Sequence, residues 1–563
     1  MKLYLTLIAL FMYLNSSATM YYVDASTGSD SNNGKTPATP WKSIAKVNNA
    51  NLLAGDFVLF ARGQTFRGNL TAKSGTATSN ITYGAYGTGN KPLFFGSINR
   101  KLTTDWESAG TYLWKTSNVV TVSGDAVDAG NLIFDNEASV GWKVSSLSLV
   151  TGQGRFYSDV ASKTVTMFSE GNPGLVYSNI EIALGKNAIG ISSKSYVVIE
   201  NLDVRYTGVH GIGCNEVDHI IVKDVDMSYI GGTYQKVTTR LGNGVEFYNG
   251  ANNCSVDRCT FNQIYDAAVT NQGDATNCQQ YNIYYRNNII RSSEYSFELW
   301  LRGTGASLHD IYFENNTCLD AGVCWAHEQR VDPNASHLCF WGTWATFSNI
   351  VIRNNIFSNS VGAGIFEGKT NLADLNTSKV IINNNDWCVT NMLAVMTGWD
   401  SVKPGPINTY YNWNYYQSNT KQDVNSITSN PLLTTEFAIS SNSPCVNTGT
   451  VSTATTDYIG TSRPQGNGWD IGAFEFKSPL SINENNLNNR FSIYPNPATD
   501  SITITLTVLN RDQQMQIFNS IGELMKEFKI TQSAQINIAD FANGIYLIQI
   551  KGFPQQTQKF LKQ

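Results

Sequence analysis

A short phrase of alternating apolar and polar residues recurs along the middle of the chain. Each phrase has the two-residue period of a β-strand, and most end in a residue type that tolerates a sharp turn. No helical period fills the irregular intervals between phrases, so the repeats predict a parallel β-helix whose coils keep their strands and vary their loops. The phrases stand at Tyr196–Leu202, His219–Val225, Asn253–Cys259, Asn282–Asn288, Asp310–Asn316, Asn349–Asn355 and Lys379–Asn385.

Four consecutive phrases end in the pair Asn-Asn. If the coils stack in register, Asn288, Asn316, Asn355 and Asn385 occupy one turn position. Stacked side-chain amides there would bond from coil to coil and satisfy polar groups that would otherwise be buried unpaired. The alternative is that these asparagines lie in separate surface turns.

The Asn-Asn-ended strands resemble those of the right-handed parallel β-helix proteins of the pectin-lyase-like superfamily, and the likeness covers most of residues 21–476. This resemblance implies the fold and only suggests the reaction. The chain lacks the Trp-Ile-Asp-His and Arg-x-Pro-x-x-Arg signatures of pectate lyases. It also lacks the Asn-Thr-Asp, Asp-Asp and Arg-Ile-Lys motifs of polygalacturonases, so neither family's catalytic residues can be transferred.

The N-terminal part of the sequence predicts three segments: a signal peptide, a cap of the β-helix and an inserted subdomain. Lys2 followed by the apolar run Leu3–Leu14 predicts a secretory signal peptide over residues 1–20. Tyr21–Val47 resembles the N-terminal cap of bacterial β-helix carbohydrate-active proteins. Residues from about 98 to 180 break the repeat and predict an antiparallel β insertion, which would either wall one side of a substrate groove or be plain decoration. Asp470–Phe476 resembles a last coil and closing strand.

The C-terminal part begins with a polar linker at residues 477–489, and residues 490–563 alternate as the strands of a small β-sandwich. Tyr494–Pro497 and Gly544–Tyr546 carry motifs that resemble the C-terminal sorting domain of the type IX secretion system. The resemblance implies a chain exported across the outer membrane of a Gram-negative bacterium, secreted or attached to the cell surface, with that machinery as a partner. The alternative reading of the tail is a carbohydrate-binding sandwich.

Composition excludes several classes of partner. A net charge of −5 over 563 residues favours neither nucleic acid nor an anionic membrane. No second apolar stretch approaches the ~20 residues that a membrane helix needs. The 27 Tyr, 26 Phe and 12 Trp suit stacked strands and sugar-binding surfaces. The nine cysteines lack zinc spacing, and we expect most to fill apolar rungs, with one or two local disulfides allowed. We expect a monomer.

The strand after each Asn turn predicts a column of outward side chains. The inward positions are predicted to be Ile212, Val245, Val269, Phe297, Trp325 and Ile365, which leaves Gly213, Glu246, Thr270, Glu298, Ala326 and Phe366 outward. Glu246 and Glu298 would stand two rungs, about 10 Å, apart. Side chains that lean together reach the ~6.5–9.5 Å separation with which a water attacks a sugar with inversion. Grouped carboxylates also raise one pKa, as a general acid requires.

Further polar and aromatic residues cluster near this column. We predict Glu298, Glu246, His327, Glu328 and Glu367 as candidate catalytic residues, and Trp300, Arg302, Arg330, Asp332, Asn271 and Tyr248 as candidate substrate-binding residues. Outward carboxylates are usually solvated, and Arg330 with Asp332 can equally form a loop ion pair. A register slip of one residue would turn the whole column inward.

These residues predict a secreted, polysaccharide-degrading glycoside hydrolase. One alternative is a polysaccharide lyase acting by β-elimination on a uronate-containing glycan, with His327, Arg330 and Arg302 serving as base and cations and with Ca²⁺ as a possible cofactor; the hydrolase needs no cofactor. The other alternative is a non-catalytic β-helix for adhesion or glycan binding.

Overall fold

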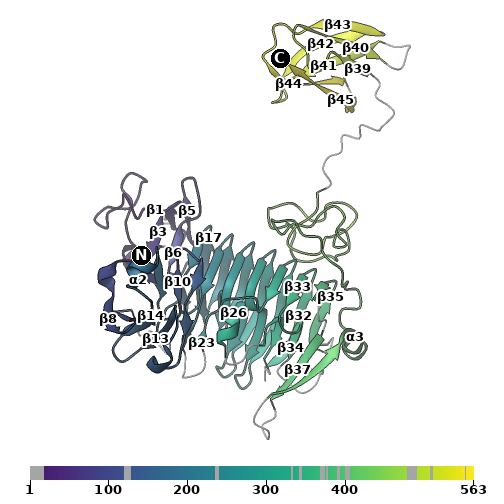
Figure 1. Cartoon of the computed structure of the whole chain (residues 1–563). Helices are drawn as coiled ribbons and strands as arrows, with labels where there is room; N and C mark the ends of the chain where they lie inside the picture. The colour runs from purple at the N-terminus through teal and green to yellow at the C-terminus, as the bar shows by residue number, and fades with distance from the viewer. Residues whose placement is uncertain are drawn as a thin grey trace, which may run out of the picture. The chain divides into compact units, whose positions relative to one another are not determined.

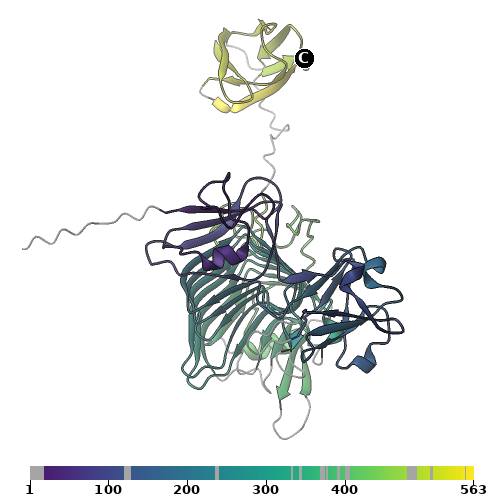
Figure 2. The ribbon, with the colours of Figure 1, turned by 90° about the vertical axis from the view of Figure 1, so that its left-hand side faces the viewer.

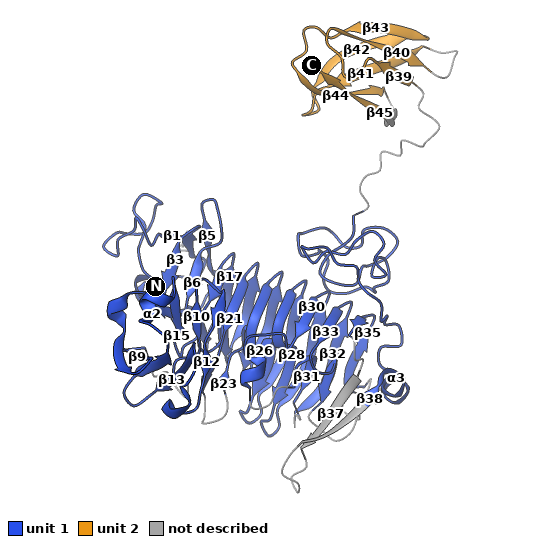
Figure 3. Cartoon of the chain, in the orientation of Figure 1, with its two compact units in different colours: residues 1–477 blue, residues 478–563 orange. Residues whose placement is uncertain are grey.

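The structure, a computed structural model, forms two compact units, residues 1–477 and residues 478–563 (Figures 1 and 3). It describes residues 18–119, 128–234, 240–330, 334–341, 345–367, 375, 378–389, 393–399, 406–477, 491–506, 512–551 and 553–563. The predicted signal peptide lies mostly outside these ranges, as does the predicted linker. The first strand begins at Met20.

The first unit is the predicted right-handed parallel β-helix, and one of its faces is a ten-stranded parallel sheet (Figure 1). Successive repeats pair residue for residue in this sheet, as in Val197↔Ile220 and Ile283↔Ile311. The inward residue of each strand is buried in one continuous core. The sheet contains, in order, β1 (Met20–Val23), β2 (Phe57–Ala61), β5 (Ile81–Tyr86), β17 (Ser195–Glu200), β20 (Asp218–Lys223), β25 (Asn252–Asp257), β27 (Gln279–Arg286), β29 (Ser307–Glu314), β32 (Thr346–Arg353) and β35 (Val380–Asn383).

The remaining faces form a seventeen-stranded sheet because two long strands, β26 (Thr260–Gly273) and β28 (Ile289–Leu301), run through both. The face nearer the Asn turns contains β3 (Thr65–Arg67), β6 (Leu93–Phe95), β18 (Asp203–Arg205), β21 (Asp226–Ile230), β30 (Thr317–Ala321), β33 (Ile356–Ser360) and β36 (Asp386–Cys388). The other face contains β4 (Leu70–Thr71), β16 (Ile189–Ser192), β19 (Ile212–Asn215), β24 (Val245–Tyr248), β31 (Ser336–Phe340), β34 (Ile365–Glu367), β37 (Leu393–Trp399) and β38 (Pro406–Asn412).

The predicted asparagine ladder is present and explains the Asn-Asn pairs. The first asparagine of each pair has a left-handed backbone, with φ of 54° at Asn287 and Asn315, a conformation that Asn adopts more readily than most residues. The second is fully buried. Nδ2 of Asn316 donates to Oδ1 of Asn355 (3.0 Å) and to the carbonyl of Tyr285 (3.0 Å), and its Oδ1 accepts from Nδ2 of Asn288 (2.9 Å).

Substituting Asn316→Leu is expected to destabilise the β-helix by about 2 kcal/mol, because several buried donors and acceptors of adjacent coils lose their partners. Chemical denaturation of the full chain measures this loss. Asn419→Leu on the exposed surface of α3 (Trp413–Thr420) is the matched control and should change stability by no more than about 0.5 kcal/mol. Equal losses in the two variants would contradict a structural role for the ladder.

The N-terminal end of the β-helix is covered by α1 (Ile44–Asn49), which buries Ile44 and Val47 on the core. Oγ of Ser43 caps this helix by accepting from the backbone N–H of Lys46. Residues between β7 (Ser97–Asn99) and β15 (Ile180–Ala183) form a subdomain with its own small core at the side of the β-helix (Figure 2). Its strands are almost all antiparallel. Its elements are η1 (Thr103–Asp105), β8 (Glu107–Gly110), β9 (Leu113–Ser117), β10 (Leu132–Phe134), β11 (Ser139–Val140), β12 (Trp142–Lys143), η2 (Leu147–Leu149), β13 (Arg155–Asp159), β14 (Thr164–Phe168) and α2 (Pro173–Val176).

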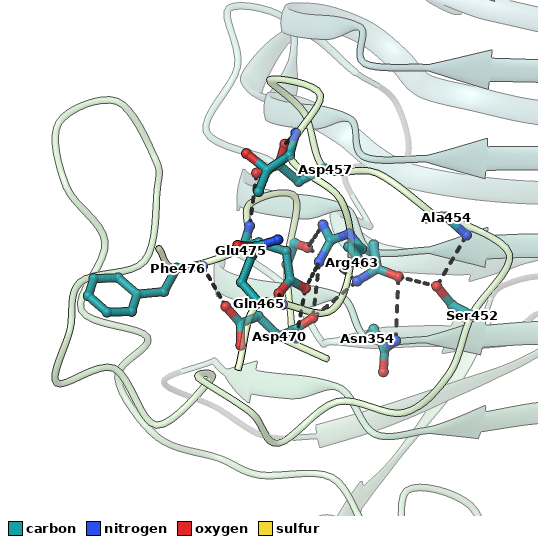
Figure 4. Close-up of polar contacts among 12 residues, drawn as sticks. Asn354, Ser452, Ala454, Asp457, Arg463, Gln465, Asp470, Glu475 and Phe476 are labelled. Atoms are coloured by element: carbon teal, nitrogen blue, oxygen red, sulfur yellow. Dashed lines mark hydrogen bonds and ion pairs between the residues drawn. The ribbon is translucent and has the colours of Figure 1, made fainter. Parts of the chain in front are cut away.

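The prediction of a closing strand at Asp470–Phe476 is wrong. Residues 421–477 contain no strand and instead run back across the turns of earlier coils. Hydrogen bonds of the buried Arg463 hold this segment in place. Its Nη1 donates to Oε1 of Glu475 (2.6 Å; Figure 4). Its Nη2 donates to Oδ1 of Asn287 (3.1 Å). Backbone N–H groups bind the carboxylate of Asp470, so side-chain and turn hydrogen bonds replace the ladder bonds that a strand would make.

The cysteines are free thiols. All nine lie among the described residues, and none forms a disulfide with another. Five fill apolar positions of the main core, as predicted for most of them, namely Cys214, Cys254, Cys259, Cys278 and Cys318.

The second unit is the predicted β-sandwich, with a core of its own. A three-stranded sheet contains β39 (Phe491–Tyr494), β40 (Ser501–Leu506) and β43 (Ser533–Asn537). A four-stranded sheet contains β42 (Leu524–Ile530), β41 (Gln513–Phe518), β44 (Gly544–Ile550) and β45 (Phe553–Lys562). Among the described residues of the whole chain, no helix has the length and apolar character needed to cross a bilayer.

Candidate active site on the outer face

The predicted column of outward residues exists, with one error. Glu246 pairs with Thr270 and Thr270 with Glu298, so the two glutamates stand two rungs apart on one outer face. Their neighbours Val245, Val269 and Phe297 are buried in the core, as predicted. The prediction for the next rung is wrong. Leu338 occupies the inward position that was predicted for Trp325, and Cys339 occupies the outward position that was predicted for Ala326.

The error has a local cause. Ala326 has a right-handed helical backbone and leads into the 3₁₀ helix η3 (His327–Gln329), so this segment leaves the strand register. Oε2 of Glu294, a fully buried carboxylate on β28, binds Nδ1 of His327 (2.9 Å). The backbone N–H of Ala335 donates to the other oxygen of Glu294 (3.0 Å) just before β31 begins. The buried Glu294 therefore holds a segment that leaves the strand between β28 and β31, and the two-residue period alone does not predict this departure.

Glu298 has the environment of a proton donor. Its side chain is buried on the outer face, and its Oε2 accepts from Oγ1 of Thr270 (3.0 Å) and Nε2 of Gln272 (2.6 Å). Burial, followed by the charge of Asp266, raises the pKa of Glu298 to about 8. The carboxyl group therefore keeps its proton at neutral pH.

Glu246 is held by a buried histidine. The backbone N–H of Asn243 donates to Nδ1 of His210 (3.1 Å), so the neutral ring carries its proton on Nε2. This atom lies 3.1 Å from Oε2 of Glu246. Burial lowers the pKa of His210 to about 3 and raises the pKa of Glu246 to about 8, so the contact at neutral pH is a hydrogen bond between uncharged groups.

Asp266 completes the cluster, and the sequence prediction missed it. The pairing of β26 with β28 shifts between Ile264 and Ala267, so Tyr265 and Asp266 together oppose the single residue Glu294. Such a β-bulge re-aims the extra side chain and is common beside active sites. The charge of Asp266 raises the pKa of both Glu246 and Glu298, which places the three carboxyl groups within electrostatic reach of one another.

The bulge had a faint signal in the sequence. Phe261, Ile264 and Val269 all lie in the core, although Ile264 is an odd number of residues from each of the other two. In a regular strand, residues an odd number apart point to opposite faces. The apolar pattern of this strand therefore requires extra residues, but it does not say which residue is displaced outward.

Arg330 joins the bulge to the η3 segment. Its side chain is buried, and its Nη1 donates to Oδ1 of Asp266 (3.1 Å) and to the carbonyl of Tyr265 (3.0 Å). Its Nε lies 3.7 Å from Oε1 of Glu294. The hydrogen bond that Nδ1 of His327 donates to Glu294 raises the pKa of His327. The two basic side chains of this segment, His327 and Arg330, are thus engaged by Asp266 and Glu294.

The inserted subdomain clamps the η3 segment. The backbone N–H of Lys143 donates to Oε1 of Gln329 (3.0 Å), and Nε2 of Gln329 donates to the carbonyl of Gly141 (3.1 Å). Nζ of Lys143 is buried against Asp128 (2.6 Å) and donates to the carbonyl of Gly232 (2.8 Å). Gly232 lies before the short hairpin β22 (Thr233–Tyr234) and β23 (Arg240–Leu241). Gly231 and Gly232 have left-handed backbones, with φ of 107° and 101°. A Cβ on Gly232 would also meet the carbonyl oxygen of Gly130 at 2.4 Å, so this close approach requires glycine.

Aromatic residues stand beside the carboxylate column. Tyr248 pairs with Gln272 and Gln272 with Trp300, which places Tyr248 and Trp300 on the same outer face as Glu246 and Glu298. The hydroxyl of Tyr248 donates to Asp274 (2.9 Å), and the guanidinium of exposed Arg302 covers one face of Trp300 at 5.0 Å. Trp341, which the prediction missed, follows Phe340, the partner of the residue before Trp300.

Four predicted residues stand apart from this arrangement. Asn271 points into the β-helix, where it bonds Gln280 and Tyr285, because its neighbours in register are the core residues Phe247 and Leu299. Glu367 continues that inward column and is buried. Glu328 is exposed on η3, and Asp332 lies outside the described residues. Asn271 and Glu367 are therefore corrected to interior positions.

The raised pKa of Glu298 predicts how stability depends on pH. Between the pKa of an unfolded Glu, about 4.3, and about 8, the folded chain binds the proton and the unfolded chain does not. Stability should therefore fall as pH rises through this window, by up to about 1.4 kcal/mol per pH unit for this group. Denaturation of the full chain at pH 5 to 9 measures the slope, which should flatten in Glu298→Gln. Identical slopes would contradict the raised pKa.

Among the described residues, no cluster of three or more His, Cys, Asp or Glu side chains is arranged to hold a metal ion.

Comparison with known proteins identifies the tail. Residues 492–563 match the family described as the secretion system C-terminal sorting domain. A lacto-N-biosidase of Bifidobacterium longum subsp. longum is 35% identical over 97 residues, which cover 16% of this chain and 6% of that protein. The chain thus spans a small part of this curated relative.

Solved structures show only distant similarity. A lacto-N-biosidase from Eubacterium ramulus gives a TM-score of 0.39 at 16% identity, covering 67% of this chain and 58% of that one. A pectate lyase gives 0.36 at 13% identity, covering 82% and 97%. At these scores the similarity carries no argument about the reaction. The tail does carry a conclusion: this chain has a sorting domain of the type IX secretion system, which directs export to the cell surface or beyond.

Proposed function

We propose that the chain is a glycoside hydrolase that cleaves an extracellular glycan on this outer face. The observation that carries the proposal is a buried, hydrogen-bonded acid on the outer face, Glu298, whose raised pKa favours the protonated form and which lies within electrostatic reach of Asp266, the partner of Arg330. Glycoside hydrolysis requires this combination of an acid and an ionised carboxylate. Local similarity to a lacto-N-biosidase supports the same class of reaction.

In the proposed reaction, Glu298 donates its proton to the glycosidic oxygen as the bond to the anomeric carbon breaks. The carboxylate of Asp266 stabilises the positive charge on the sugar, and either it or a water that it activates attacks the anomeric carbon. Glu246, held by His210, is the second carboxyl of the face. Tyr248, Trp300 and Trp341 offer apolar surface to pyranose rings along the same rungs.

The lyase alternative has weaker support. Elimination needs a base and a cation that neutralises the uronate carboxylate. Hydrogen bonding to Glu294 raises the pKa of His327 and so favours its protonated form, which cannot abstract a proton. Arg330 already pairs with Asp266 and lies near Glu294.

A glycan panel tests the proposal. The full chain is incubated with neutral and uronate-containing glycans, and both new reducing ends and ultraviolet absorbance are followed. New reducing ends without absorbance are expected. Absorbance from an unsaturated uronate would show that the chain is a lyase and not a hydrolase. Binding without either signal would show that it is a non-catalytic glycan-binding protein.

A further inference from the structure

The two hydrogen bonds to Glu298 converge on one oxygen. Thr270 Oγ1 and Gln272 Nε2 both donate to Oε2, at 3.0 and 2.6 Å. Both donors come from β26, where Thr270 lies directly opposite Glu298. Among the described residues, none donates a hydrogen bond to the other oxygen, Oε1.

This asymmetry determines where a proton can sit. A carboxylate oxygen offers about two acceptor sites, so an Oε2 that accepts two hydrogen bonds is saturated. The proton of the neutral acid must then reside on Oε1. Thr270 is fully buried and Glu298 nearly so, which keeps water from competing for the same sites.

Side chains inside the β-helix hold the donor strand. The hydroxyl of Tyr285 donates to Oδ1 of Asn271 (2.8 Å), and Nδ2 of Asn271 donates to Oε1 of Gln280 (2.7 Å). Nε2 of Gln280 then donates to the backbone carbonyl of Gln272 (2.7 Å). This buried chain fixes the backbone between the two donors from the side opposite Glu298, and it explains why a polar Asn271 occupies a core position.

We infer that Thr270 and Gln272 are positioning residues that hold Oε2 of Glu298 as an acceptor and confine the acidic proton to Oε1. The inference rests on the proposed function. The proton leaves Oε1 for the glycosidic oxygen, which keeps the electron pair of the broken carbon–oxygen bond. The carboxylate left behind retains both hydrogen bonds on Oε2, so the same donors also stabilise the product of proton transfer.

Three single variants test the inference: Thr270→Val, Gln272→Leu and the control Thr260→Val. Thr260 is on the same strand but bonds the hydroxyl of Tyr458 (2.9 Å) instead of a site residue. Each variant is combined with E298Q, and denaturation from pH 5 to 10 gives the stability difference that Glu298 causes in each background. The pH at which this difference levels off is the pKa of Glu298, measured without any assay of activity.

Losing either donor should raise the pKa of Glu298 by about one unit, because each hydrogen bond stabilises the ionised form. The alkaline limb of kcat/KM on the cleaved glycan should move up with it. At pH 5, where Glu298 is protonated in every variant, kcat should fall about tenfold, since the proton is no longer confined to one oxygen. Thr260→Val should change none of these values.

The outcomes separate the inference from the proposed function. An unchanged pKa of Glu298 in Thr270→Val and Gln272→Leu overturns the inference, and so does a raised pKa with full kcat at pH 5. If the pKa rises while even the wild-type chain cleaves no glycan, the contacts are real but the proposed function fails, and the catalytic inference fails with it.

Discussion

Substituting Glu298→Gln is expected to lower kcat/KM on the cleaved glycan by about 10³-fold, the loss that follows removal of a general acid. Gln keeps the shape of the side chain but has no proton of suitable acidity to give to the leaving group. Glycan binding should persist, because the aromatic column is untouched. Steady-state kinetics with binding measured by calorimetry separates the two effects.

Stability provides an internal control for that variant. Gln has no buried charge to form at high pH, so Glu298→Gln should be at least as stable as the wild-type chain at pH 8. Glu216→Gln removes an exposed carboxylate from the coil of β19 and should leave kcat/KM unchanged. Full activity in Glu298→Gln would rule out the proposed acid. An adhesive β-helix would bind glycan equally in the wild-type chain and both variants and would show turnover in none of them.

Substituting Arg330→Met is expected to destabilise the first unit by about 3–5 kcal/mol, the usual cost of removing one partner from a buried ion pair. The carboxylate of Asp266, at 3.1 Å, loses its cation, and the fully buried Glu294 loses a nearby positive charge. Chemical denaturation of the full chain measures the loss. Arg302→Met, at an exposed position over Trp300, should cost less than about 1 kcal/mol.

A double variant tests whether the stability lost in Arg330→Met comes from the unpaired charge of Asp266. Asp266→Asn in the Arg330→Met background removes one uncompensated charge and should recover part of the lost stability. Additive losses in the double variant would mean that Asp266 and Arg330 act independently, contrary to their hydrogen bond.

Prediction from the sequence succeeded where it rested on a pattern that repeats along the chain. The two-residue period identified the strands, and four repeated Asn-Asn pairs identified a ladder whose hydrogen bonds the structure contains. The same period placed Glu246 and Glu298 on one outer face two rungs apart. It failed at Trp325 and Ala326, where a buried Glu294 binds His327 and diverts the chain into η3.

What the sequence determined by itself is therefore the coiled architecture and the face on which the two glutamates stand, because both follow from a local pattern repeated along the chain, and the secretion tail, because two short motifs mark it. Only the tertiary structure decided that Asp266 joins them and that Arg330 pairs with it, whereas the inward direction of Asn271 and Glu367 already follows from alternation, since each comes one residue after an outward position. The positions of Asp266 and Arg330 depend on a bulge between neighbouring coils and on partners far away in the chain. Contacts of that kind leave no period in the sequence, because one displaced residue reverses the direction of its side chain.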